Sequence, residues 1–143
     1  KCGAGERMSN AETVESYLRR SDMPHEQIDP ETWVLELNNS RRSRVALMIE
    51  DPIVLFSTSV LDVTDETGER EALFRSLLEL NNTLVHCAYA IQDDRVVLSG
   101  ALPIENLDQN EFQAVVDDMA VALDSHEATL APWTPSPATD SEA

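Results

Sequence analysis

Apolar residues recur along the chain at two different spacings, and these spacings predict where helices and strands lie. The first pattern is helical and begins at a capping box formed by Ser9 and Glu12. Its apolar positions continue through Leu18, which predicts a helix to about residue 22. The next segment, 23–30, contains two prolines and is expected to break this helix.

Apolar and polar residues then alternate, which is typical of strands with one buried face. Alternation around 33–37 and 45–49, followed by a segment rich in β-branched and aromatic residues at 53–63, predicts three strands. The connections between them are short and polar, so the three strands are expected to form an antiparallel meander.

The second half of the chain shows both spacings again. Helical spacing predicts a helix over 71–80 and a last helix that starts at Asp108. Between them, alternation predicts a hairpin over 85–102 that turns at Asp93 and Asp94. The resulting order, α-β-β-β-α-β-β-α, indicates an α+β fold in which helices pack on a mostly antiparallel sheet.

These elements predict a single domain over 9–130. Residues 1–8 show no periodic pattern and are expected to form a flexible N-terminus, with a composition that fits a vector remnant. Residues 131–143 are rich in Pro, Ser and Thr, and we expect a flexible tail there.

The predicted helix over 71–80 is more hydrophobic than one small domain can cover. Its apolar residues form two neighbouring stripes, of which one can pack on the domain's own sheet. The other needs a partner, and a second copy of the chain supplies one most simply. The sequence therefore predicts a homodimer and leaves open which stripe faces the partner. The candidate interface residues, including one from the hairpin, are Leu73, Phe74, Leu77, Leu78, Leu80 and Val97.

The charge balance restricts the partners of the protein. The 143 residues include 27 Asp and Glu against 10 Lys and Arg, for a net charge of −17. Such a surface repels nucleic-acid phosphates and anionic membranes, so neither is an expected partner. The charge is explained by solubility or by a partner with basic segments. Two cysteines, Cys2 and Cys87, make no disulfide framework, and a reducing cytoplasm fits them best.

The sequence contains no pattern that indicates a site for catalysis, a cofactor or a metal. The glycines are too dispersed for a phosphate-binding loop, and the acidic segment 62–73 does not match the calcium-loop template. Cys87 falls in an alternating apolar strand, where a thiol is normally inert. The three histidines are expected in different places: His25 in a loop, His86 in a strand and His126 at a helix end. None has the spacing to other residues that zinc ligands need. Arg41, Arg42 and Arg44 are expected in a solvated hairpin turn.

Two classes of function remain ahead of a third, an outright enzyme, which would need converging polar groups. The first is a non-enzymatic protein-binding module, either chaperone-like or a regulatory adaptor. The second is a small-ligand sensor or an enzyme accessory domain with a pocket between the sheet and the helices. An exposed apolar groove would favour the first class, and a deep enclosed pocket with perturbed carboxylates would favour the second.

The order of elements and several segments resemble a known family. The segments are 14–18, 33–35, 51–56 (DPIVLF), 77–81 (LLELN), the strand of Tyr89, 95–98 (RVVL) and 102–103 (LP). They are similar to the type III secretion chaperone fold of the Tir-chaperone (CesT-type) proteins, and in detail to the YbjN-like proteins. This resemblance covers about 12–123. It implies homodimers that bind an extended client segment, and it implies no catalytic residue.

Overall fold

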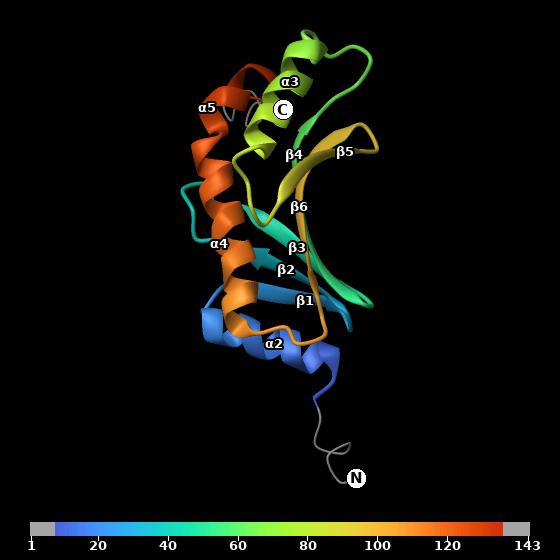
Figure 1. Cartoon of the computed structure of the whole chain (residues 1–143), viewed down its shortest axis with the longest axis vertical. Coiled ribbons are helices and arrows are strands. Elements are labelled where there is room, and N and C mark those ends of the chain that lie inside the picture. The colour runs from blue at the N-terminus through green and yellow to red at the C-terminus, as the bar shows by residue number, and fades with distance from the viewer. Residues whose placement is uncertain (1–7, 136–143) are drawn as a thin grey trace.

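The computed structural model describes residues 8–135, which form helices and strands in the order shown in Figure 1. Four α-helices, six strands and one short 3₁₀ helix follow one another in this part of the chain. They are α2 (Asn10–Ser21), β1 (His25–Asp29), β2 (Thr32–Glu36), β3 (Arg44–Glu50), β4 (Ile53–Asp62), α3 (Arg70–Asn81), β5 (Ala88–Gln92), β6 (Arg95–Pro103), α4 (Gln109–Ser125), α5 (Glu127–Leu130) and η1 (Ala131–Trp133).

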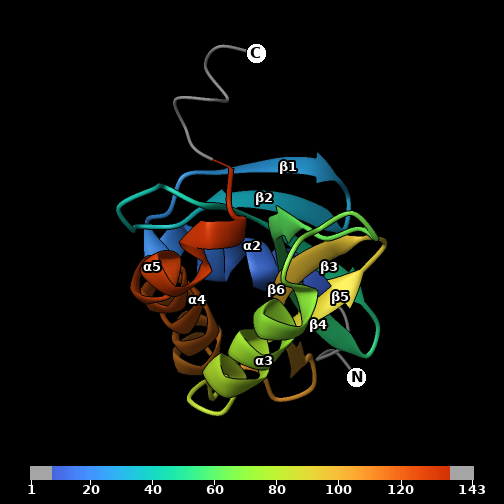
Figure 2. The same cartoon turned by 90° about the horizontal axis from the view of Figure 1, so that it is seen from above.

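The strands make one antiparallel sheet in the order β1-β2-β3-β4-β6-β5. Figures 1 and 2 show the helices on one side of this sheet, so the domain has two layers. The prediction of an α+β fold with a mostly antiparallel sheet is confirmed. The three-strand meander appears as β2, β3 and β4, and the hairpin as β5 and β6.

Strand β1 is the main difference from the sequence prediction, which placed a break over 23–30 and a loop at His25. Residues His25–Asp29 instead pair with β2 and form one edge of the sheet. Four of the five residues are exposed, so the strand lacks the alternation that identifies a strand in a sequence. The prolines do not interfere because Pro24 and Pro30 lie just outside it.

Both ends of the second half also differ from the prediction. Strand β5 begins at Ala88 instead of Val85, which is 81% exposed, and His86 lies in the bend before the strand. The chain continues past 130 into η1, where the Trp133 indole N–H donates to the Gly68 carbonyl at 3.1 Å. The predicted flexible segments are otherwise outside the described residues, and the bounds of the domain stay a prediction.

One hydrophobic core fills the space between the sheet and the helices. Side chains from β2, β3, β4 and β6 alternate into it, and every long helix contributes to it. The rings of Phe56 on β4 and Phe112 on α4 lie 5.4 Å apart at its centre. Each fully buried side chain of this size contributes about 1.5–3 kcal/mol to folding. Its largest members are Trp33, Phe56, Phe112, Leu18, Leu35, Leu37, Leu47, Leu73, Leu98 and Met119.

Gly100 lets two elements approach strand β6 on the core side. A Cβ atom at this position would lie 2.7 Å from the His86 carbonyl oxygen and 3.2 Å from a methyl group of Val115 on α4. Backbone oxygen cannot yield as a flexible side chain does, so the close packing of α4 and the bend before β5 requires glycine here.

Candidate functional site

Helix α3 presents its two stripes to different surroundings. Leu73 and Leu77 are buried in the domain's core. Leu80 is partly buried and packs against that core. In the other stripe, Phe74 is half-buried and Leu78 is 70% exposed. The stripe of Leu78 is therefore the one that points outward. The dimer interface stays a prediction.

The exposed side of α3 combines apolar and charged groups. Phe74 and Leu78 line an open depression of about 640 Å³, which is flanked by charged side chains of the same helix. Arg75 forms an ion pair with Glu79 at 3.2 Å between Nε and Oε2. Glu71 lies on the same face of the helix, one turn before Arg75. An apolar centre with charges of both signs is typical of a protein-binding surface.

The sheet provides a second uncovered surface, on the face away from the helices. Its outward residues include half-buried apolar side chains that do not belong to the core. They are Val34, Ala46, Met48, Ile53 and Leu55. Val97 also lies outside the core cluster; it is 6% exposed, with Ser59 and Ala90 as its register partners on β4 and β5. We call this surface the open sheet face.

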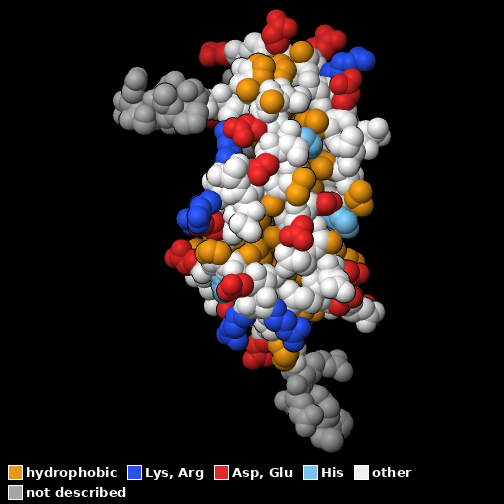
Figure 3. All heavy atoms as spheres, turned by 90° about the vertical axis from the view of Figure 1, so that its left-hand side faces the viewer, with side chains coloured by type: hydrophobic (Ala, Val, Ile, Leu, Met, Phe, Trp, Pro, Cys, Tyr) orange, Lys and Arg blue, Asp and Glu red, His pale blue; other side chains and the backbone are white. Residues whose placement is uncertain are grey.

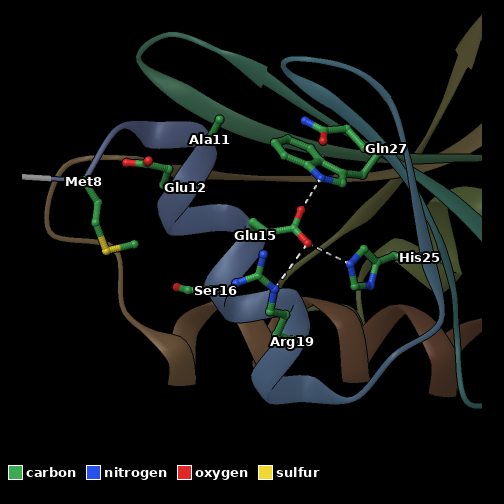
Figure 4. A pocket seen from close by; sticks show the side chains of 9 residues that line it. Met8, Ala11, Glu12, Glu15, Ser16, Arg19, His25 and Gln27 are labelled. Atoms are coloured by element: carbon green, nitrogen blue, oxygen red, sulfur yellow. Dashed lines mark hydrogen bonds and ion pairs between the residues drawn. The ribbon is translucent and has the colours of Figure 1, made fainter.

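A cleft between α2 and the first two strands holds a group of connected polar contacts (Figure 4). Glu15 on α2 lies at its centre and accepts a hydrogen bond from the Trp33 indole N–H at 2.9 Å. Its other carboxylate oxygen is 3.1 Å from His25 Nε2 and 3.6 Å from Arg19 Nε. Burial opposes the charge on Glu15, but the hydrogen bonds from Trp33 and His25 and the nearby positive charges outweigh it and lower the pKa of this carboxyl.

This cleft does not have the properties that would favour a small-ligand sensor. It is open to solvent along α2, and its central carboxylate already binds three side chains of the protein itself. Ligand sites are usually concave, largely apolar and supplied with free polar groups. The exposed apolar surfaces are therefore better candidates for a binding site than the cleft is.

The residues considered for metal or nucleophilic chemistry lie apart. Within residues 8–135, no group of three or more His, Cys, Asp or Glu side chains is arranged to hold a metal ion. Cys87 is buried, and burial with the nearby Asp118 charge raises the pKa of its thiol to about 11. Such a thiol stays protonated and unreactive near neutral pH. Cys2 lies outside the described residues.

The arginine cluster lies at the β2–β3 hairpin, as predicted, and all three of its members are exposed. Two of them also form ion pairs. Arg41 pairs with Glu127 of α5 at 3.4 Å, and Arg42 pairs with Glu36 at 3.2 Å. Acidic side chains are spread over the helical side of the molecule without gathering in one patch (Figure 3). None of the helices in residues 8–135 combines the length and hydrophobicity that a bilayer-spanning helix needs.

A comparison with models of known protein families identifies the family of this chain. The model CesT_Tir_1 matches residues 7–135, which is nearly the whole chain. The chain belongs to the CesT/Tir chaperone family. Members of this family are non-enzymatic chaperones, so the prediction of a non-enzymatic protein is confirmed, as is the resemblance stated from the sequence. No significant match to a curated protein sequence was found.

Solved structures show the same fold at low sequence identity. YbjN from E. coli is 15% identical, with a TM-score of 0.58, over 82% of this chain and 91% of that chain. A chain of the heterodimeric ExoU-SpcU complex from the Pseudomonas aeruginosa type III secretion system is 16% identical, with a TM-score of 0.60, over 85% and 97%.

A third structure is that of the Yersinia pestis type III secretion chaperone SycH in complex with a fragment of YscM2. It is 13% identical to this chain, with a TM-score of 0.57, over 82% of this chain and 98% of that chain. At these identities the likeness establishes the fold, and it confirms the predicted type III secretion chaperone-like architecture.

The sequence missed two features of these surfaces. The open sheet face was not predicted, because alternation identifies the inward residues and does not show whether a helix covers the other side. The contacts of His25 and Glu15 were also missed, because β1 was not recognised as a strand. The one signal for the open sheet face in the sequence was that outward positions such as Met48 and Leu55 are apolar.

Proposed function

We propose that the protein is a chaperone-like or regulatory adaptor that works in the cytoplasm as a homodimer and binds a protein client. Family membership supports a chaperone role, and relatives of this fold were solved in complexes with protein partners, such as SycH with a fragment of YscM2. The observation that carries the proposal for this chain is the exposed apolar stripe of α3 at Leu78 and Phe74.

The outward side of α3 suits contact with a second copy of itself. A two-fold interface needs a patch that is complementary to itself. Two α3 helices that cross in antiparallel orientation would bury Leu78 and Phe74 of both copies. The same arrangement brings Arg75 of one copy toward Glu71 or Glu79 of the other, which are of opposite charge. The dimer would leave the open sheet face free for the client.

The dimer is tested by light scattering on a variant that places a charge in the apolar stripe, Leu78→Glu. The wild-type protein should give about twice the chain mass of 15.9 kDa, and Leu78→Glu should give the chain mass. Val121→Glu is the matched control because Val121 is also an exposed apolar residue, 63% accessible, but lies on α4. It should remain dimeric. A monomeric wild-type protein would refute the homodimer.

The client surface is tested on the open sheet face with Leu55→Glu. Proteins retained from native lysate by the wild type should be lost with Leu55→Glu and kept with Val121→Glu, because only the first variant alters the sheet. Circular dichroism confirms that each variant is folded. If all three baits retain the same proteins, the open sheet face does not bind the client.

A further inference from the structure

All three histidines of the chain join a helix to an element at an edge of the sheet. His25 of β1 contacts Glu15 of α2. At the other edge, His86 contacts Asp118 of α4 at 2.6 Å, and His126 at the end of α4 contacts the Tyr89 hydroxyl of β5 at 2.8 Å. Within the described residues, His25 is the one histidine with hydrogen-bond partners at both ring nitrogens.

The partners of His25 both accept hydrogen bonds. Nδ1 lies 2.8 Å from the Met23 carbonyl oxygen, and Nε2 lies 3.1 Å from a carboxylate oxygen of Glu15. A neutral imidazole has one N–H donor, whereas the doubly protonated ring has two. Glu15 is held as a carboxylate by the Trp33 indole N–H and by Arg19. Both contacts can therefore exist together when His25 is an imidazolium.

Strand β1 has few other contacts that hold it in place. It is an edge strand that pairs with β2 alone, and its pairing is irregular between Gln27 and Asp29. His25 is its half-buried residue, and the other four are exposed. Just before it, the Pro24 carbonyl accepts a hydrogen bond from the Glu36 amide at 2.9 Å. The His25 side chain links this strand to α2 through its contact with Glu15.

We propose that His25 is a proton-dependent clamp that holds the edge strand β1 against helix α2. With the proton bound, the ring bridges the Met23 carbonyl and the Glu15 carboxylate. When the proton is released, one ring nitrogen stops being a donor, one of the two bonds is lost, and β1 is held less firmly. The clamp is engaged at acidic pH and released as pH rises through the range in which histidine titrates.

Charged side chains of both signs surround His25. Helix α2 contributes two acidic groups and one basic group to the cleft beside the ring, and a small hollow on its other side is lined by residues of β1, β2 and β3. Acidic groups outnumber basic groups in this set. The set consists of Glu12, Glu15, Arg19, Glu26, Glu36 and Arg44. The clamp is independent of the proposed homodimer and client.

Hydrogen exchange followed by NMR tests the clamp on the full chain. The reporter is the Glu36 amide, because its acceptor is the carbonyl of the residue before His25. Its protection factor, corrected for intrinsic exchange and referred to the β6 amides, should fall about tenfold between about pH 5 and about pH 8, as one bond to a charged group is lost. The Trp33 indole proton should shift over the same range, because it binds the same carboxylate.

Two variants separate the clamp from other effects of pH. His25→Gln cannot gain a proton, so the protection of Glu36 should no longer depend on pH. His86→Gln removes a histidine at the opposite edge of the sheet and should leave the pH dependence at Glu36 intact. The proposal is wrong if protection in the wild type is equal at both pH values or if the fall persists in His25→Gln. If His25→Gln does not fold, an unchanged Trp33 indole resonance in the wild type would equally overturn it.

Discussion

The two faces of the sheet come from the same strands and differ in what covers them. On β4, Phe56 points toward the helices and is fully buried, while its neighbour Leu55 points to the open sheet face and is half-buried. Both are large and apolar. The difference shows that hydrophobicity alone does not tell which face belongs to the core, since that depends on which side the helices pack. The apolar residues left over form the surface available to a partner.

The largest expected difference between the two faces concerns stability. Phe56→Ala should lower the free energy of unfolding by about 3–5 kcal/mol, because it leaves a cavity beside Phe112. Leu55→Ala should lower it by about 1 kcal/mol, because water already reaches that side. Urea denaturation of both variants measures the contrast. Equal losses would mean that the open sheet face is as well covered as the core.

A second experiment tests the packing on the covered face by adding a Cβ atom at Gly100. Gly100→Ala should cost about 1–3 kcal/mol, because its Cβ would meet the His86 carbonyl oxygen and Val115. Gly68→Ala is the matched control, since no atom lies within 4 Å of its Cβ position. It should leave stability unchanged or slightly raised. Thermal unfolding compares the two, and a neutral Gly100→Ala would contradict the close approach of α4 to β6.

The smallest expected effect concerns the edge at β5. Burial lowers the pKa of His126, whose ring nitrogen contacts the Tyr89 hydroxyl, and burial raises the pKa of Tyr89, which stays a donor. The unfolded chain therefore binds a proton more readily at His126, and this contribution to stability is lost as pH falls below the ordinary histidine value of about 6.5.

This pH effect is measured as the difference between two proteins. Between about pH 7 and about pH 5, the wild type should lose more stability than His126→Gln, which does not titrate. Urea unfolding at the two pH values gives both free energies, and the change should be smaller than that of Gly100→Ala. An identical pH dependence in the two proteins would show that protonation of His126 does not disturb its contact with Tyr89.

The sequence predicted most of the fold because its elements follow their local patterns. The first helix begins at Ser9 with both halves of the capping box formed, and the last begins at Asp108, whose side chain caps the Glu111 amide. The hairpin turns at Asp93 and Asp94, both with positive φ, as a two-residue type I′ turn requires. The long alternating strands were found for the same reason.

The rest was missed because it depends on contacts between distant segments. Strand β1 exists because β2 offers a partner, although four of its residues are exposed and carry no periodic signal. The orientation of α3 is decided by the core that Leu73 and Leu77 enter, and the sequence presents both stripes equally. The dimer interface and its residues stay predictions that the Leu78→Glu experiment will decide.

The order of strands has a consequence for synthesis of the protein. The ten-residue strand β4 pairs on one side with β3 and on the other with β6, which follows it only after α3 and β5. A ribosome that adds about 5–20 residues per second leaves one edge of β4 unpaired for several seconds. Its apolar residues on both faces make that edge prone to association with other chains. The yield of folded protein in cells should therefore fall when many copies are translated at once.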